Sequence, residues 1–113
     1  MRYNNFTQLI GYVDNYSLLD TTEGDFVKFE FTLAIQRPIY DETQPPKVDY
    51  VPVFAYNKVA HKARAVVKKG LLVHCQAHLT MSAAQQGKIP RIVLEDIKAL
   101  YRDKETNIYE ANV

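Results

Sequence analysis

Aromatic side chains recur at alternate positions of one apolar stretch, Val48 to Lys58, which reads V-D-Y-V-P-V-F-A-Y-N-K. The aromatic residues share one parity: Tyr50, Phe54 and Tyr56. The other parity is small and aliphatic: Val51, Val53 and Ala55. Because successive side chains of a strand point to opposite faces, the stretch predicts one core face and one aromatic face. Rings on a sheet surface are able to stack unpaired bases. The alternative is a strand buried on both faces, in which the rings fill a second core.

Basic side chains elsewhere in the chain are suited to contact phosphates beside this row: Arg37, Lys47, Lys58, Lys88 and Arg91. A further tyrosine, Tyr40, lies in a proline-rich segment and adds another ring. The net charge is only +1, so a polyanion would be held by local clusters and stacking rather than by total charge. We therefore expect these residues and the aromatic row to form one nucleic-acid-binding surface.

Metal binding and catalysis find little support in the sequence. His74 and His78 share a strand face but lie about 13 Å apart at ~3.3 Å per residue, too far for one ion, and Cys75 has the core-facing parity. Glu95 and Asp96 are adjacent, so a regular strand sends them to opposite faces. No glycine-rich phosphate loop, nucleophile elbow or paired-carboxylate pattern occurs. We predict neither an enzyme nor a metal or cofactor site.

Alternating or apolar runs predict the strands that position this surface. Their ranges are Thr7 to Val13, Phe26 to Arg37, Tyr50 to Tyr56, Leu71 to Met81 and Ile89 to Leu100. Gly11, inside the first range, indicates a bulge, a bend or a close backbone approach. Pro52 removes a donor from the third range, so a bulge there would swap the parity on one side of it.

One helix is predicted between the third and fourth strands. Asn57 is a good N-cap, Lys58 to Lys69 is the helical range, and Gly70 is placed to end it. The apolar face contains Val59, Ala63, Val66 and Val67. The other face is basic, with Lys58, Lys62, Arg64, Lys68 and Lys69. The simplest interpretation of that cluster is a solvated face, and the alternative is a binding face.

Turn and loop signals separate these elements. Thr21 to Asp25 predicts a turn at Gly24, and Gln85 to Lys88 predicts another. Pro38 to Lys47 predicts a long loop, which is either a mobile binding arm or disordered filler, and the neighbouring basic and aromatic residues favour the binding arm. Strands with one short helix and no βαβ alternation predict an all-β fold, a five-stranded barrel of the oligonucleotide-binding (OB) type.

The bulk composition fits one small folded domain. A chain of 113 residues has room for a single core, and we expect residues 1–100 to form it and 101–113 to be a short polar tail. A single cysteine excludes an internal disulfide and fits a reducing compartment. The chain opens without a signal-peptide pattern and has no apolar run of membrane-spanning length, so a cytoplasmic protein is expected.

At these segments the sequence resembles the bacterial and phage single-stranded DNA-binding protein family, over about Asn5 to Leu100. T-Q-L-I-G-Y-V is similar to the family's opening strand, and F-V-K-F-E-F-T-L-A to its second. V-D-Y-V-P-V-F-A-Y-N-K-V-A is similar to the third strand and helix start, and A-V-V-K-K-G-L-L-V to the turn into the fourth strand. The order and spacing of the segments carry the resemblance.

The resemblance implies largely sequence-independent binding of single-stranded DNA in replication, recombination or repair, at the nucleoid. It puts stacking aromatics at Tyr50, Tyr56 and near Tyr40, whereas Phe54 is added from its parity alone. It also implies pairing of the first strand's open edge with a second subunit, hence a homodimer or homotetramer. Replication or recombination proteins are the further partners expected.

The sequence departs from the family pattern at particular places. Pro52 stands where a basic residue is expected, and Ser82-Ala83-Ala84 stands where the last stacking aromatic is expected, in a short, weakly basic hairpin. These differences bear on affinity and binding mode. The family's long glycine-rich tail with an acidic tip is also absent from the sequence, which bears on partner recruitment.

The short chain and plain hairpin are also similar to a dimeric relative in the family, the primosomal replication protein. The second interpretation is therefore an OB-fold interaction module that binds DNA weakly and docks replication-restart or helicase-loading partners. Tight binding of a bare oligonucleotide separates the two interpretations.

Overall fold

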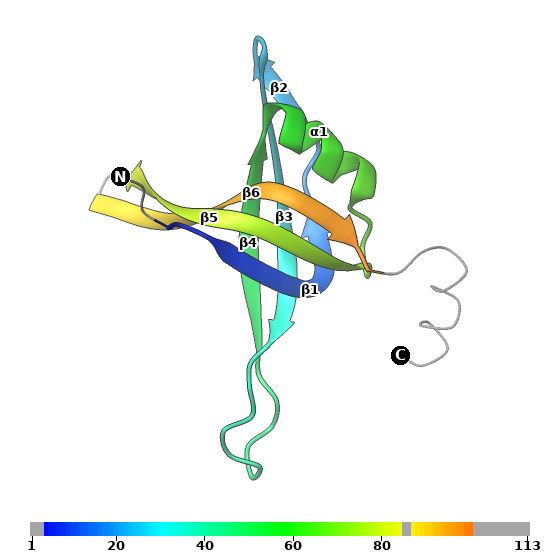
Figure 1. The fold of residues 1–113 in the computed structure, drawn as a ribbon, viewed down its shortest axis with the longest axis vertical. Coiled ribbons are helices and arrows are strands. Elements are labelled where there is room, and N and C mark those ends of the chain that lie inside the picture. The colour runs from blue at the N-terminus through cyan, green and yellow to red at the C-terminus, as the bar shows by residue number, and fades with distance from the viewer. Residues whose placement is uncertain (1–3, 85–86, 101–113) are drawn as a thin grey trace.

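The computed structural model describes residues 4–84 and 87–100, which form an almost wholly β structure with one helix (Figure 1). The elements in chain order are β1 (Thr7–Tyr16), β2 (Asp20–Glu23), β3 (Phe26–Gln36), β4 (Val48–Tyr56), α1 (Asn57–Val66), β5 (Leu72–Ala84) and β6 (Gly87–Ala99). Every predicted strand is present. The predicted tail, 101–113, lies outside the described residues.

The sheet closes into a barrel because β1 pairs with two different strands. The order is β1-β5-β6-β4-β3-β2, and β1 also pairs with β3. The first half of β1 pairs with β5, and the second half, from Tyr12 to Tyr16, pairs with β3. The remaining short strand, β2, pairs only with β3, outside the closed ring. The OB-type barrel is therefore confirmed; because β2 was not predicted, the helix lies between β4 and β5 in this numbering.

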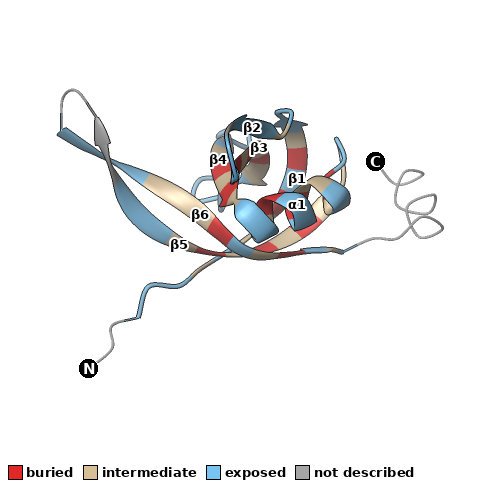
Figure 2. Ribbon diagram, turned by 90° about the horizontal axis from the view of Figure 1, so that it is seen from above, coloured by how far each residue is buried: buried red, intermediate tan, exposed pale blue. Residues whose placement is uncertain are grey.

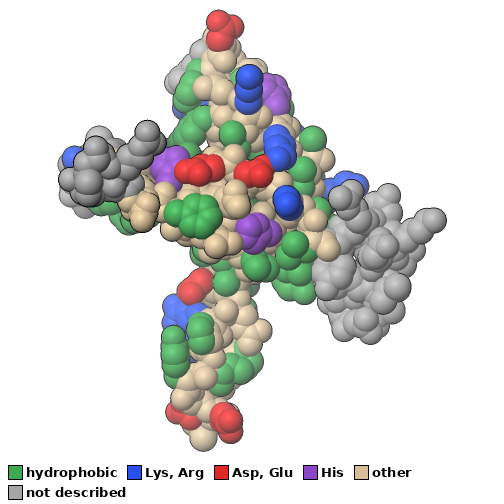
Figure 3. Space-filling model, viewed as in Figure 1, with side chains coloured by type: hydrophobic (Ala, Val, Ile, Leu, Met, Phe, Trp, Pro, Cys, Tyr) green, Lys and Arg blue, Asp and Glu red, His purple; other side chains and the backbone are tan. Residues whose placement is uncertain are grey.

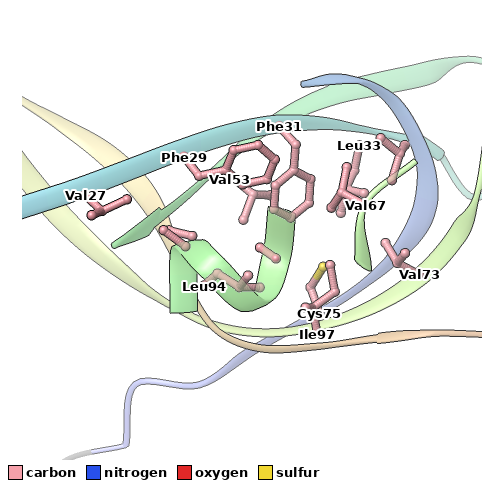
Figure 4. Packing of buried hydrophobic residues seen from close by; sticks show 14 residues of the cluster. Val27, Phe29, Phe31, Leu33, Val53, Val67, Val73, Cys75, Leu94 and Ile97 are labelled. Carbon is pink, nitrogen blue, oxygen red and sulfur yellow. The ribbon is translucent and has the colours of Figure 1, made fainter. Parts of the chain in front are cut away.

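The core lies inside the barrel and follows the alternation of the strands (Figure 4). In β3 the buried residues are Val27, Phe29, Phe31 and Leu33, each separated by a more exposed one. Val53 and Ala55 of β4 and Val73 and Cys75 of β5 contribute to the same cluster. Helix α1 packs against β3, β4 and β6 through Ala60 and Ala63, and Val67 is buried just beyond its end.

Gly11 marks a close approach of two strands, as its position in the sequence suggested. A Cβ added there would lie 2.8 Å from the Ala34 carbonyl oxygen and 2.8 Å from Ile35 Cγ1. The register shift in β1 occurs elsewhere, between Val13 and Asn15. A side chain at position 11 would therefore push β1 away from β3 where the barrel closes.

Several predicted boundaries are wrong. β1 continues to Tyr16 instead of ending at Val13, and Thr21 to Glu23, predicted as part of a turn, belong to β2. The helix ends at Val66, where the Val67 N–H donates to the Ala63 carbonyl; Gly70, with φ of 85°, lies in the following turn. The predicted turn at Gln85 to Lys88 is shorter, because β5 and β6 continue pairing until Ala84 meets Gly87. Gln85 and Gln86 are outside the described residues. The resulting β5–β6 hairpin extends well beyond the barrel (Figure 2).

The prediction for Glu95 and Asp96 is also wrong. A bulge in β6 opposite Gln76 and Ala77 leaves both acidic residues out of the core, while Leu94 and Ile97 on either side are buried. Within the described part of the chain, no helix is long and apolar enough to span a membrane.

Candidate nucleic-acid interface

The outer face of β4 carries the aromatic row that the sequence predicted. Val53 and Ala55 are fully buried, whereas Tyr50 is 61% exposed and Phe54 and Tyr56 are half-buried. β4 pairs with β3 without a register shift on either side of Pro52, which lies opposite Thr32. The parity is therefore kept across Pro52, and all three rings leave the sheet on the side opposite the core.

Arg91 joins two of these rings from the neighbouring strand. β4 and β6 run parallel and pair at Val53–Ile92 and Phe54–Val93, which brings Arg91 beside the row. Its guanidinium carbon lies over the Phe54 ring, 4.2 Å from the centroid, and Nη1 donates a 3.2 Å hydrogen bond to the Tyr56 hydroxyl. Both contacts link residues far apart in sequence, so the predicted site residues Phe54, Tyr56 and Arg91 form one cluster.

A fourth aromatic residue, Phe26, belongs to this cluster and was not predicted. Its ring stacks on Tyr56, with centroids 5.5 Å apart and planes at 23°. Lys28 lies over the Phe26 ring, 5.9 Å from its centroid, and pairs with Tyr56 across the β3–β4 ladder. The sequence held one signal: Phe26 has the parity opposite to Val27 and the other core residues of β3.

Asn57 lies beside this stack, and its predicted role as an N-cap is wrong. The residue that precedes the helix is Tyr56, and it makes no side-chain cap hydrogen bond. Asn57 has a left-handed backbone, with φ of 54°, and its Oδ1 accepts a 3.1 Å hydrogen bond from the Val27 N–H. Asparagine tolerates this conformation better than most residues. The contact ties the start of β3 to the start of α1, next to the Phe26–Tyr56 stack.

The β3–β4 loop projects away from the barrel as an arm (Figure 1). Its neck is closed by a 2.8 Å hydrogen bond from the Arg37 N–H to the Lys47 carbonyl. Tyr40 is 90% exposed, as a stacking ring on an arm requires. The arm also forms a hollow, lined by Arg37, Pro38, Ile39, Tyr40, Asp41, Gln44, Pro45, Pro46 and Lys47. Figure 3 shows hydrophobic side chains along this arm and acidic ones at its tip.

Arg37 is not an unpaired cation. Its Nη2 lies 2.8 Å from Asp49 Oδ1, and its Nε donates to both carboxylate oxygens at 2.9 and 3.0 Å. This hydrogen bonding holds the pKa of Asp49 below its ordinary value. A phosphate would have to compete with Asp49 for Arg37. Asp49 has the parity opposite to that of Tyr50 in β4, so the pair lies on the other face from the Tyr50 ring.

The other predicted cations are exposed and lie on three different elements. Lys58 lies in the first turn of α1, Lys88 lies near the start of β6 in the extended hairpin, and Lys47 lies at the end of the arm. On the face of the barrel that Figure 3 shows, acidic and basic side chains are interspersed.

Two basic residues of α1 have partners within the chain. Lys62 forms an ion pair with Asp96 of β6, and the Arg64 guanidinium lies over the Tyr16 ring, 4.9 Å from its centroid. Both contacts attach the helix to the barrel. They account for part of the basic face without a ligand, in line with a structural role for that face.

The histidines and the cysteine each have a separate environment. His74 Nε2 and Gln8 Oε1 are 2.8 Å apart, and so are His78 Nδ1 and Glu95 Oε2. Cys75 is fully buried, and burial raises the pKa of its thiol to about 12. Among residues 4–84 and 87–100, no three His, Cys, Asp or Glu side chains gather closely enough to hold a metal ion.

Comparison with known proteins agrees with the fold. The sequence model described as the single-strand binding protein family matches residues 4–100. The wild-type single-stranded DNA binding protein from Thermus aquaticus has a similar fold, with a TM-score of 0.73 and 20% identity over 89% of this chain and 52% of that one. A deletion mutant of the same protein (delta 228-252 R190A) gives a TM-score of 0.70 and 20% identity over 87% and 51%. The chain thus spans about half the length of these structures. No curated protein sequence matches it.

Proposed function

Because the chain belongs to the single-strand binding protein family, we propose that it binds single-stranded DNA, without catalysis, through the outer face of β4. The observation that carries the proposal is the aromatic row Tyr50, Phe54 and Tyr56, which leaves the sheet on the side opposite the core. Every base has a flat face, so a row of rings binds a single strand with little regard to sequence.

The arm and the surrounding cations complete the proposed surface. Tyr40 offers an exposed ring, and Arg37, Lys47, Lys58 and Lys88 are exposed basic residues that a phosphate backbone is able to reach. With a net charge of +1, few of them are expected to act at once. For single strands the logarithm of affinity falls with the logarithm of salt by roughly 0.7 per phosphate contact, so the proposal implies a shallow salt dependence.

The family places this activity in replication, recombination and repair, and we propose the same setting for the chain, on DNA in the cytoplasm. The domain of residues 1–100 would be the binding unit. Replication or recombination proteins are its proposed partners.

We also propose that the chain forms a homodimer or homotetramer. Among the described residues, Thr7 to Gly11 of β1 pair with β5 on one side only, and the β3 pairing begins at Tyr12. An edge with unpaired backbone groups favours pairing with another chain. Light scattering at micromolar concentration tests this directly, because a monomer of 13.0 kDa would contradict it.

Competition between single and double strands tests the DNA-binding proposal. A labelled thymine homopolymer is bound to the protein, and fluorescence anisotropy follows its release by unlabelled single-stranded or duplex DNA of equal length. A stacking surface requires unpaired bases, so the single strand should compete far better than the duplex. Equal competition would contradict the proposal. A failure to bind either form would favour the interaction-module interpretation.

A further inference from the structure

The Phe54 ring is covered on one side in the free protein, and the group that covers it is itself flat. The guanidinium carbon of Arg91 lies 4.2 Å from the ring centroid, well inside the range of a cation–π contact. Phe54 and Arg91 are both half-buried. A base that approaches this side of the ring meets the guanidinium first.

Arg91 is held in this position from more than one side. Its backbone belongs to β6, one residue before Ile92, which pairs with Val53 in the barrel wall. Its Nη1 donates to the Tyr56 hydroxyl at 3.2 Å, and the Tyr56 ring is fixed in turn by its stack on Phe26. The side chain is therefore ordered before any ligand arrives, which lowers the entropic cost of binding.

The positive charge of Arg91 is not neutralised by these contacts. In the described ranges its hydrogen-bond acceptor is a neutral phenol, and no carboxylate forms an ion pair with it, in contrast to Arg37 and Lys62. A guanidinium is weakly hydrated and planar, and such planes stack on nucleic-acid bases. Its remaining N–H groups are available at the edge of the plane.

We propose that one base of the bound strand stacks on the guanidinium of Arg91 rather than on the Phe54 ring beneath it, so that Arg91 is a stacking plate of the interface and not a phosphate contact. This inference rests on the proposed function and assigns Arg91 a role within the proposed DNA-binding surface. Tyr50 and Tyr40 remain the rings that are open to bases directly.

The two roles for Arg91 differ in what a lysine is able to replace. Lysine supplies a point charge for a phosphate but has no plane to stack. The test compares Arg91→Lys with the wild-type protein on a thymine homopolymer and on an abasic strand of the same length, at several salt concentrations. Arg64→Lys is the matched control, since Arg64 also lies over a ring, that of Tyr16, but on α1.

Stacking predicts that Arg91→Lys loses about fivefold or more in affinity for the thymine strand, with an unchanged salt slope. The loss should disappear on the abasic strand, which has no base to stack, and Arg64→Lys should bind like the wild type. Thermal unfolding of each variant verifies that the fold is kept.

The inference is overturned if Arg91→Lys binds the thymine strand like the wild type, or if its loss is equally large on the abasic strand. The variant Tyr50→Ala distinguishes failure of the Arg91 inference from failure of the proposed function. Weakened binding by Tyr50→Ala beside wild-type binding by Arg91→Lys would reject the stacking plate alone. Failure of the wild-type protein to bind the thymine strand would reject the proposed function itself.

Discussion

Truncation of Tyr50 is the perturbation that separates the binding face of β4 from its core face. The side chain is 61% exposed and lies one residue before Val51 on the opposite parity. If a base stacks on it, Tyr50→Ala removes a contact worth about 1–3 kcal/mol. At about 1.4 kcal/mol per tenfold, the affinity for single-stranded DNA should fall between about fivefold and about 100-fold.

The same substitution should cost little stability. Full burial of a large apolar side chain supplies about 1.5–3 kcal/mol, and less than half of Tyr50 is buried, so the loss is expected to be about 1 kcal/mol. For a domain of this size that lowers the melting temperature by about 4 °C. Phe31 has the opposite expectation, because it is fully buried on β3: Phe31→Ala should cost about 3–5 kcal/mol.

The assay is a pair of measurements on each variant: anisotropy of a labelled thymine strand and thermal unfolding by circular dichroism. Leu18→Ala is the control, because it truncates another exposed apolar side chain, in the segment between β1 and β2, away from both the β4 face and the proposed subunit edge. It should change neither quantity by much. Undiminished DNA binding by Tyr50→Ala, together with a large drop in melting temperature, would refute the assignment of this face to DNA.

Three further predictions concern the barrel and its charges. Gly11→Ala should destabilise the fold by about 1–3 kcal/mol in denaturant unfolding, because the new Cβ meets the Ala34 carbonyl; wild-type stability would contradict the close approach. Cys75, with its pKa raised to about 12, should react with a thiol reagent at neutral pH only after unfolding, and rapid reaction of the native protein would contradict its burial. The Arg37 hydrogen bond lowers the pKa of Asp49, so its contribution to stability is complete above about pH 4 and is lost as the pH falls through the folded-state pKa. Asp49→Asn should therefore flatten the acid side of a melting-temperature profile, and an unchanged profile would show that the pair is not formed.

The strands and the two faces of β4 were predictable because burial follows the two-residue period of a strand. Alternation in β3 and β4 located Phe29, Phe31 and Val53 in the core and Tyr50 outside it, and the pairing across Pro52 preserved that pattern. Gly11 was predictable for a related reason, since a glycine inside a strand indicates a place where a side chain does not fit.

The contacts that complete the candidate site were not predictable, because each depends on strand register. Arg91 reaches Phe54 only because β4 and β6 run parallel in the register Val53–Ile92. The same holds for Phe26, whose ring meets Tyr56 across the β3–β4 edge.

Predictions from local sequence patterns were wrong where contacts between distant segments determined the conformation. Asn57 matched an N-cap, but its side chain instead accepts a hydrogen bond from the Val27 N–H. Glu95 and Asp96 matched a regular strand, but the bulge in the β5–β6 pairing changed their faces. Arg37 was predicted to contact phosphate, but in the structure it forms an ion pair with Asp49. This pair depends on the closed neck of the arm, which brings the two residues together.

Tyrosine emission during titration with a thymine homopolymer tests the central claim most directly. The chain has eight tyrosines and no tryptophan, so its intrinsic emission reports on the tyrosine rings. If bases stack on the rings of β4 and the arm, emission should be quenched in proportion to bound DNA, and Tyr50→Ala should reduce the amplitude of quenching. Binding of the strand with tyrosine emission unchanged, or no binding at micromolar protein, would contradict the account.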